Sequence, residues 1–344
     1  MPEYAIVKDF SGKLWNSFLE KHSNGNFEQS FEYGEISKKA FPRSNVVRLA
    51  CLRGNEPVGI LQGIYSKYFG FGMSLGIMRG PVVNFDGTDY THVVECLLRA
   101  IEDYARKNHV IEARVWVPQA WGVDAVFNSL GYSLVSRYNE YVVDLEKGID
   151  DVWKSFSHNK RRNIKKALGM GVQVDESRRT EDLLTFYSML TAAEKRGGFT
   201  SYPLSFFKAV WELYSPDLSK VFLARWNGKA VSGVFTVMHG KTVFALAAGS
   251  FSEGWMVRPN DIMHWKVMEW AMEKGYSRYQ MGLVSDPPPS PESALWGIWR
   301  WKREWKGRLE KLNVFHKYFH QKYKLILKAK KFAEKTYQFM SRLG

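Results

Sequence analysis

The most unusual chemical feature of the sequence is a lysine set among tryptophans near the end of the chain. Lys302 lies within a few residues of Trp296, Trp299, Trp301 and Trp305. Aromatic side chains lower the local dielectric and can stack a nucleobase, and a cation between them could stabilise an oxyanion or a leaving oxygen. The alternative is an amphipathic helix with tryptophans inward and lysines in water. We predict that Lys302 is catalytic and that Trp301 contacts the substrate.

A run of basic residues offers a second kind of chemistry, the binding of phosphate. The segment 160–166 is dominated by basic residues, namely Lys160, Arg161, Arg162, Lys165 and Lys166. Such a density of like charge is costly without counter-charge, which favours phosphate contact over the alternative of a solvated helix face. We therefore predict that these residues bind the phosphates of a nucleic acid or of a phosphorylated substrate.

Other patterns that could carry chemistry are sparse. Arg79 and Arg196 stand beside glycines at the ends of predicted elements, where side chains can reach a substrate, although either could instead hold a turn. The sequence has no G-x-S-x-G, no H-E-x-x-H and no convincing cysteine–histidine pair. His316 and His320 have metal-ligand spacing, but histidines of a basic tail are better explained as surface residues. We predict neither a covalent nucleophile nor a metal.

These candidates need a large scaffold, and the composition supports one. The chain has 344 residues, of which 45% are hydrophobic, and this length predicts two globular domains. Its 49 basic residues outnumber 35 acidic ones, and the net charge of +14 indicates an anionic partner such as nucleic acid, a phosphorylated substrate or a membrane surface. No apolar run of membrane-spanning length occurs, and the start does not resemble a signal peptide, so we expect a cytoplasmic protein.

The order of predicted elements occurs twice along the chain. Two apolar runs are broken by turn pairs, Gly54-Asn55 in the first half and Asn227-Gly228 in the second, and each break is typical of a β-hairpin. A helix precedes each hairpin, and a strand, a helix and a further strand follow it. This repeat predicts an α/β (α+β) fold of tandem duplicated GNAT-like acyltransferase domains with mixed sheets. We expect a first lobe over residues 1–150, a second lobe with the catalytic cleft over 151–312, and a basic C-terminal helix over 313–344.

Short motifs along nearly the whole chain resemble those of the Fem family, the aminoacyltransferases of peptidoglycan bridges. They occur in the family's order: FEQSFEYG at 27–34, MRGPV at 78–82, WKSFSHNKRRNIKK at 153–166, AEKRG at 193–197, AGS at 248–250 and WKREWKG at 301–307. Each motif is short, but their joint order agrees with the duplicated architecture. The last of them is similar to the family's aromatic-lysine-x-x-aromatic motif and contains Lys302.

This resemblance implies a particular reaction. The donor would be an aminoacyl-tRNA, and the acceptor would be an amine on the peptide stem of a nucleotide- or lipid-linked cell-wall precursor. The amine attacks the activated ester, an oxyanion forms, and the 3′ hydroxyl of the tRNA leaves. Positioning and charge stabilisation carry such a reaction, and the resemblance implies no cofactor besides the aminoacyl-tRNA.

The resemblance also implies positions that contact the substrate. A family lysine falls at Ser37, so the neighbouring Lys38 is our candidate for its role. Tyr202 stands where the best-known members bind the precursor's diphosphate with an arginine and a tyrosine, and Asn260 stands where they have another tyrosine. These departures leave the acceptor open.

Two other functions fit parts of the sequence. A GNAT N-acyltransferase that uses acyl-CoA needs a glycine-rich turn at a helix start to hold pyrophosphate, and the sequence has no clean copy of it. A non-catalytic protein that binds nucleic acid or a membrane would need the basic surfaces but not the aromatic surroundings of Lys302. The basic tail beyond His316 predicts an amphipathic helix that either rests on an anionic membrane or packs on the body. With a membrane contact, the protein would be peripheral to the inner face of the membrane.

Overall fold

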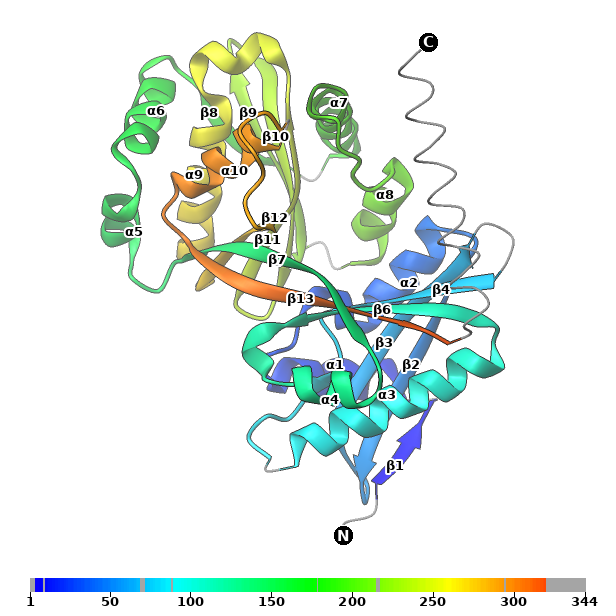
Figure 1. Cartoon of the computed structure of the whole chain (residues 1–344). Coiled ribbons are helices and arrows are strands. Elements are labelled where there is room, and N and C mark those ends of the chain that lie inside the picture. Colours follow the sequence, from blue (N-terminus) through cyan, green and yellow to red (C-terminus); the bar gives the residue numbers. More distant parts are fainter. Residues whose placement is uncertain are drawn as a thin grey trace.

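The structure of the chain is a computed structural model. It describes residues 4–8, 10–68, 72–87, 89–177, 179–214, 217–293 and 295–319. Figure 1 shows two halves, the N-terminal one in blue and cyan and the C-terminal one in green to orange, with the long strands β7 (Ser133–Asp144) and β13 (Arg308–Tyr318) running between them. Residues 320–344, which contain most of the predicted C-terminal helix, lie outside the described part.

The first half alternates helices and strands from the N-terminus to β7. Its elements are β1 (Tyr4–Val7), α1 (Gly12–Lys21), η1 (Phe27–Gln29), α2 (Phe31–Ala40), β2 (Ser44–Arg53), β3 (Glu56–Tyr68), β4 (Gly72–Met78), β5 (Val82–Val83), α3 (Tyr90–Lys107), β6 (Val110–Pro118), η2 (Gln119–Trp121) and α4 (Asp124–Ser129). The predicted apolar face of α3 is buried, and it includes Val93, Leu97 and Ile101.

The second half repeats this order after two linking helices. Its elements are α5 (Ile149–Ser155), α6 (His158–Gly169), β8 (Gln173–Ser177), α7 (Thr180–Gly197), α8 (Leu204–Leu213), β9 (Ser219–Trp226), β10 (Lys229–His239), β11 (Thr242–Ser250), η3 (Ser252–Val257), α9 (Pro259–Glu273), β12 (Arg278–Asp286) and α10 (Trp296–Arg303), followed by β13. From β1 to β7 and from β8 to β13, the main helices and strands follow each other in the same sequence. The repeat predicted from the two hairpins is therefore present.

Both predicted hairpins form. Arg53 pairs with Glu56 across the first turn, and Trp226 pairs with Lys229 across the second, so each loop has two residues. In the second turn Asn227 and Gly228 have φ values of 49° and 75°. Two consecutive left-handed residues suit the twist of a two-residue hairpin, which explains why the Asn-Gly pair predicts it.

The described strands join in one mixed sheet. Their order is β1-β2-β3-β4-β6-β13-β7-β12-β11-β10-β9-β8, with β5 beside β3. The two halves exchange their last strands: β13 of the second half pairs antiparallel with β6, and β7 of the first half pairs antiparallel with β12. The exchanged strands also pair with each other. Backbone hydrogen bonds therefore connect the halves directly.

The prediction that a helix begins at residue 313 is wrong. Residues 313–318 belong to β13, in which every residue from Leu312 to Phe315 is buried. Lys317, which the helix prediction placed on a basic face, donates a hydrogen bond to Glu102 at 2.7 Å. The sequence alone did not reveal the strand because its partners, β6 and β7, lie far away in the chain. The helix prediction for residues 320–344 lies outside the described residues.

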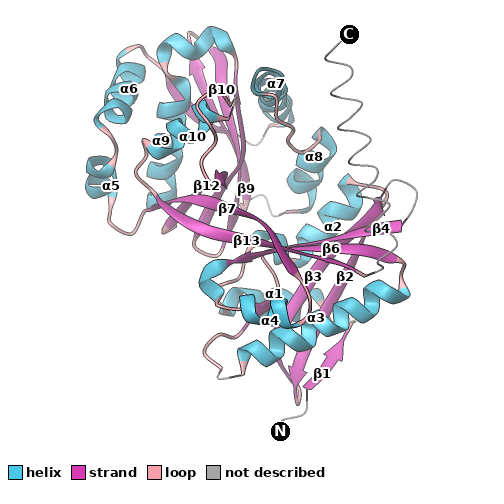
Figure 2. Cartoon of the chain, in the orientation of Figure 1, coloured by secondary structure: helices cyan, strands magenta, loops and turns pink. Residues whose placement is uncertain are grey.

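Helices cover both faces of the sheet in the second half. The helices α6 and α9 lie over one face, and α7 and α8 lie over the other (Figure 2). Tyr279 and Met281 of β12 belong to the core under α9. Because successive residues of a strand point to opposite faces, Gln280 between them points away from α9. Polar side chains can therefore approach the candidate site from either of two faces of the sheet, the one covered by α6 and α9 or the one covered by α7 and α8.

Candidate active site

In the second half, the neighbouring strands β11 and β12 diverge from each other after a short paired stretch. We call this divergence the parting. The parallel strands β11 and β12 pair only from Thr242 to Phe244 against Arg278 to Gln280. The equivalent strands of the first half, β4 and β6, pair along nearly their whole length. In β12 the pairing with β7 is also irregular between Gln280 and Leu283, and Gly282 has a φ of 76°. The parting exposes strand edges in the middle of a sheet, and it makes the second half the place of the candidate site.

Lys302 lies at this irregular stretch of β12. Its Nζ donates a hydrogen bond to the carbonyl oxygen of Leu283 at 3.0 Å, and it would stand 3.8 Å from a Cβ placed on Gly282. Its side chain makes no ion pair with any described residue, and only 9% of the residue is exposed. Burial lowers the pKa of Lys302 to about 8. A buried amine without a carboxylate partner can hold either charge state near neutral pH.

Lys302 belongs to α10, a short helix rich in tryptophan. Trp301 is half-buried and donates its Nε1–H to the carboxylate of Asp261 in α9 at 2.7 Å, while Trp305 is fully buried. Trp296 and Trp299 stack at 4.9 Å between ring centroids, and Arg303 lies over Trp299. The tryptophans around Lys302 therefore form two groups. Trp301 and Trp305 pack against the body, whereas Trp296 and Trp299 form a partly exposed stack. The substrate contact predicted for Trp301 stays a prediction.

A second polar group lies on the opposite face of β12. Arg79, which follows β4 and has a φ of 45°, forms ion pairs with Glu28 of η1 and Glu140 of β7. Gln280 of β12 donates a hydrogen bond to the same Glu140. Burial alone would lower the pKa of Arg79, but the carboxylates of Glu28 and Glu140 raise it overall. Glu140 thus links Arg79 to Gln280 of the second half, and the substrate contact predicted for Arg79 is a proposal.

A cavity of about 430 Å³ opens on the same side as this charged cluster. It is lined by residues of β11, of α7 and of the loop between α7 and α8, namely Leu190, Phe199, Thr200, Ser201, Tyr202, Leu246, Ala247 and Ala248. Tyr202 stacks on Phe206 at 4.0 Å between ring centroids. Burial raises the pKa of Tyr202, so its hydroxyl stays protonated and can donate a hydrogen bond. The position predicted from sequence at Tyr202 does line a cavity.

Two other predicted contacts secure the end of β11. Arg196 donates a hydrogen bond to the carbonyl oxygen of Ser250, and its guanidinium lies 5.0 Å from the ring centroid of Trp255. Asn260 accepts a hydrogen bond from the hydroxyl of Ser232. Both side chains therefore have structural partners close to the parting.

The basic run of α6 does not act as one surface. Lys160 is completely buried and forms an ion pair with Asp261, so the phosphate contact predicted for it is wrong in this structure. Arg161 donates hydrogen bonds to the carbonyl oxygens of Lys154 and Phe156 at 2.6 and 2.8 Å. Three members of the run are exposed and make no ion pair with described residues: Arg162, Lys165 and Lys166. Only these three retain the predicted availability for phosphate.

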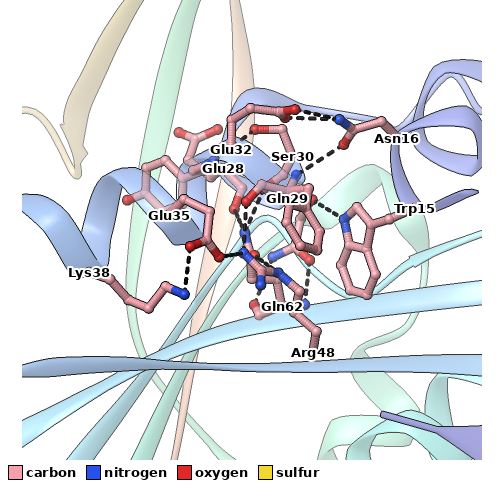
Figure 3. A network of polar contacts seen from close by, with 12 residues as sticks. Trp15, Asn16, Glu28, Gln29, Ser30, Glu32, Glu35, Lys38, Arg48 and Gln62 are labelled. Atoms are coloured by element: carbon pink, nitrogen blue, oxygen red, sulfur yellow. Dashed lines mark hydrogen bonds and ion pairs between the residues drawn. The ribbon is translucent and has the colours of Figure 1, made fainter. Parts of the chain in front are cut away.

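Lys38 lies apart from the parting, on the surface of α2. It forms an ion pair with Glu35 at 2.5 Å, and Glu35 also holds Arg48 (Figure 3). The neighbouring glutamine of the family-like motif, Gln29, is buried and donates hydrogen bonds to the carbonyl oxygens of Gln62 and Met78. This motif holds η1 against β3 and β4, and it thereby fixes Glu28 beside Arg79.

Several groups of the site carried no recognisable signal in the sequence. Asp261, His264, Glu140 and Gln280 stand in ordinary helix or strand patterns, and only the fold brings them to the parting. His264 is buried and its Nδ1 lies 2.6 Å from the hydroxyl of Tyr279. Burial, with Lys160 and Lys302 nearby, lowers the pKa of His264 to about 3, so it is neutral at physiological pH. Within the described ranges no group of three or more histidine, cysteine or acidic side chains could hold a metal ion.

The repeated order of elements, with strands that diverge in one of the two halves, is that of a tandem GNAT fold. The family described as an acetyltransferase (GNAT) domain matches residues 154–303, within the half that contains the parting. The tandem duplicated fold predicted from the repeat is confirmed by a tandem GNAT protein from the clavulanic acid biosynthesis pathway, at a TM-score of 0.61 with 10% identity, covering 92% of this chain and 99% of that one.

Comparison of whole chains points to a narrower group. A curated relative, the Lipid II:glycine glycyltransferase of Staphylococcus aureus (strain COL), is 23% identical over 92% of this chain and 93% of its own. The crystal structure of FemX superposes with a TM-score of 0.77 at 19% identity, over 90% of this chain and 96% of that one. The resemblance to the Fem family that the motifs predict is thereby confirmed. Among the described helices, none is long and apolar enough to cross a membrane.

Proposed function

We propose that the chain is an aminoacyltransferase that moves an amino acid from an aminoacyl-tRNA to an amine of a peptidoglycan precursor peptide. The observation that carries the proposal is the parting of β11 and β12 with the ammonium of Lys302 beside it. An ester carbonyl seated in the parting would be within reach of backbone groups of β12 and of Lys302. The similarity to a lipid II:glycine glycyltransferase over nearly the whole chain supports the acceptor class.

The two faces of the sheet suit the two substrates. Lys302 comes from the side of α9 and α10, whereas the cavity beside Tyr202 lies on the side of α7 and α8. On that second side the carboxylates of Glu28 and Glu140 face one guanidinium, that of Arg79, and Glu28 Oε2 has no hydrogen-bond partner among the described residues. An excess of carboxylate suits an approaching ammonium group. We therefore assign the acceptor amine to the cavity side and the donor ester to the side of α10.

The reaction then needs only groups already present. The acceptor's ammonium group first gives up one proton to solvent. Its neutral amine then attacks the ester carbonyl carbon, a C–N bond forms, and the C–O bond to the 3′ oxygen of the donor breaks. The amine loses a proton and the departing oxygen gains one. Lys302 in its ammonium form donates a hydrogen bond to the oxyanion, a contribution that low local dielectric strengthens. Neither a covalent nucleophile nor a cofactor besides the aminoacyl-tRNA is required.

The start of α9 argues for tRNA rather than acyl-CoA as donor. Backbone N–H groups at a helix start hold pyrophosphate well, because they are unpaired and the helix dipole is positive there. The helix α9, which follows β11, begins with Pro259, which has no N–H, and has the carboxylate of Asp261 in its first turn. Both features weaken this position as a pyrophosphate site. A lipid-linked acceptor would place the enzyme, as a peripheral protein, at the inner face of the membrane.

The deciding experiment follows label from donor to acceptor. Radiolabelled aminoacyl-tRNA is incubated with a stem-peptide precursor, and the peptide is separated and counted. Transfer that needs an intact stem-peptide amine, and that stops when the tRNA is deacylated beforehand, is the expected result. Transfer of an acetyl group from acetyl-CoA to an amine, without any transfer from aminoacyl-tRNA, would contradict the proposal and favour an ordinary GNAT acyltransferase.

A further inference from the structure

A buried carboxylate ties three helices together behind the candidate site. Asp261 is 4% exposed and lies in the first turn of α9. Its Oδ1 accepts hydrogen bonds from Lys160 Nζ of α6 and from Trp301 Nε1 of α10, and its Oδ2 accepts one from Asn163 Nδ2 of α6 at 3.0 Å. This carboxylate therefore links α6 and α10 to α9.

The cation of this cluster is enclosed rather than solvated. Lys160 is 0% exposed, its Nζ lies 4.5 Å from the ring centroids of both Trp301 and Trp305, and Glu304 Oε2 is 3.8 Å away. Burial lowers the pKa of Lys160, while Asp261 and Glu304 oppose that shift. Taking both members of an ion pair out of water costs several kcal/mol per ion, and their attraction does little more than offset that cost, so the cluster contributes little net stability. Stability therefore does not explain why a buried ion pair, and not apolar residues, occupies this position.

The geometry of α10 supplies that reason. The helix has eight residues, too few to be stable alone in water, and a proline-rich segment precedes it. Its position is therefore set by side chains that reach the body. Two of them donate hydrogen bonds, Trp301 to Asp261 in α9 and Lys302 to a carbonyl oxygen of β12. Lys302 is the next residue in the helix, and it reaches Leu283 in β12. A shift of about 1 Å in a catalytic group can cost roughly a hundredfold in rate.

We infer that Asp261 is a positioning residue: through Trp301 it fixes α10 and holds the amine of Lys302 at the parting of the sheet. The inference rests on the proposed function for its catalytic consequence, but the placement of Lys302 can be measured without any substrate. Lys160 acts in the same cluster through its ion pair with Asp261 and by packing against the two tryptophan rings.

Three variants test the link and one serves as a matched control. Trp301→Phe keeps the ring but removes the N–H, and Asp261→Asn keeps the shape but removes the charge. The double variant Lys160→Met with Asp261→Leu removes the buried pair without leaving a lone charge. Asn163→Ala removes only the Oδ2 partner in α6 and leaves the bond to α10 in place. Circular dichroism and thermal unfolding establish that each variant is folded.

The expected outcome in the transfer assay is a split between kcat and KM. Trp301→Phe and the double variant should lower kcat by about tenfold to a hundredfold while KM for either substrate changes by less than about threefold. Asn163→Ala should keep near-normal kcat. If both α10-directed variants are folded and turn over like the wild type, Asp261 only stabilises the fold and the inference is overturned.

A titration of Lys302 by NMR, with ¹⁵N-labelled lysine in the resting protein, separates this inference from the proposed function. Among the described titratable groups, His264 lies close enough to Lys302 for their charges to interact, and it is unchanged in every variant. In Trp301→Phe and Asp261→Asn we expect the titration of Lys302 to move toward that of an exposed lysine, with Asn163→Ala unchanged. An unmoved Lys302 titration in both variants would refute positioning. A moved titration with no transfer in the wild type would retain positioning and refute the proposed function.

Discussion

At the residue scale, two of the buried lysines, Lys160 and Lys302, have opposite surroundings. Lys160 has a carboxylate, two tryptophan rings and a second carboxylate nearby, and all its interactions are internal. Among the residues that the structure describes, Lys302 has one hydrogen-bond partner, the carbonyl oxygen of Leu283, and it stands beside Gly282, which leaves space open. The ammonium of Lys160 is already surrounded by partners, so it cannot also bind a substrate oxygen. The ammonium of Lys302 has room for a further hydrogen bond, and this difference makes Lys302 the candidate catalytic group.

Replacement of Lys302 by methionine keeps the length of the side chain and removes its charge. We expect Lys302→Met to lower kcat/KM for transfer by about 3–4 kcal/mol of transition-state stabilisation, or a few hundredfold or more. The fold should persist, because the change leaves no buried partner charge alone. The measurement is the radiolabel assay together with thermal unfolding. Near-normal turnover of a folded Lys302→Met protein would remove Lys302 from the mechanism.

The pH dependence of transfer tests the charge state that Lys302 needs. Because burial lowers its pKa to about 8, the ammonium form is dominant at pH 7 and only about a tenth remains at pH 9. If the ammonium stabilises the oxyanion, kcat/KM should fall about tenfold per pH unit above pH 8, after correction for ionisation of the free acceptor amine. Lys302→Arg, whose charge does not titrate in this range, should lack that descending limb even at reduced activity. Activity that instead rises through pH 8 with Lys302 present would indicate a general base.

At the element scale, α6 shows why a count of charges misjudged a surface. The prediction grouped five basic residues, yet Lys160, Ile164 and Ala167 recur at the spacing of one helix face, and this face is buried. The sequence therefore did contain a signal that Lys160 points inward with Ile164. What it could not contain was the partner, since Asp261 lies a hundred residues further along and reaches Lys160 only through the packing of α6 on α9.

The strand β13 belongs to the second half in sequence and to both halves in structure. Phe315 of β13 is 1% exposed and stacks on Phe127 of α4, with 4.5 Å between ring centroids. We expect Phe315→Ala to lower the free energy of unfolding by about 3–5 kcal/mol, through lost apolar burial and the cavity that it leaves. Leu309→Ala in the same strand is the matched control, because Leu309 is 48% exposed and should change stability by less than about 0.5 kcal/mol.

Chemical denaturation followed by tryptophan fluorescence and circular dichroism measures this effect. Because β13 pairs with both β6 and β7, loosening it should lower the midpoint for both halves together. A transition confined to the first half would show that the exchanged strands do not couple the two.

At the scale of the whole molecule, the duplicated fold could be predicted from sequence while the centre of the sheet could not. The turn pairs Gly54-Asn55 and Asn227-Gly228 and the apolar face of α3 are local signals, and the structure confirms them. The exchange of β7 and β13 depends on pairing between distant segments, which no local pattern specifies. The same holds for the site. Lys302 stood out by its neighbours in sequence, whereas Glu140 and Asp261 become site residues only through contacts across the fold.

The distribution of charge over the molecule separates the two candidate donors. A tRNA presents dozens of phosphates to a chain with a net charge of +14, whereas coenzyme A presents only a few. Arg162, Lys165 and Lys166 of α6 are exposed and make no ion pair with described residues, so they can release counterions from phosphate when tRNA binds. We expect tRNA affinity to fall by orders of magnitude between about 50 and 200 mM salt.

The variant that tests this carries Arg162→Gln, Lys165→Gln and Lys166→Gln together. Removal of three phosphate contacts should reduce the slope of log affinity against log salt by roughly 2 to 3, since each contact contributes about 0.7 to 0.9. The Lys160-centred core should be untouched, because none of the three side chains is buried, so thermal unfolding should match the wild type. The measurement is a fluorescence anisotropy titration at several salt concentrations, with acetyl-CoA binding measured in parallel by calorimetry.

A salt slope unchanged by the triple variant would place the tRNA elsewhere on the surface. Micromolar binding of acetyl-CoA, together with a shallow salt dependence for tRNA, would move the donor assignment to acyl-CoA, since a few phosphates held by backbone groups release few counterions.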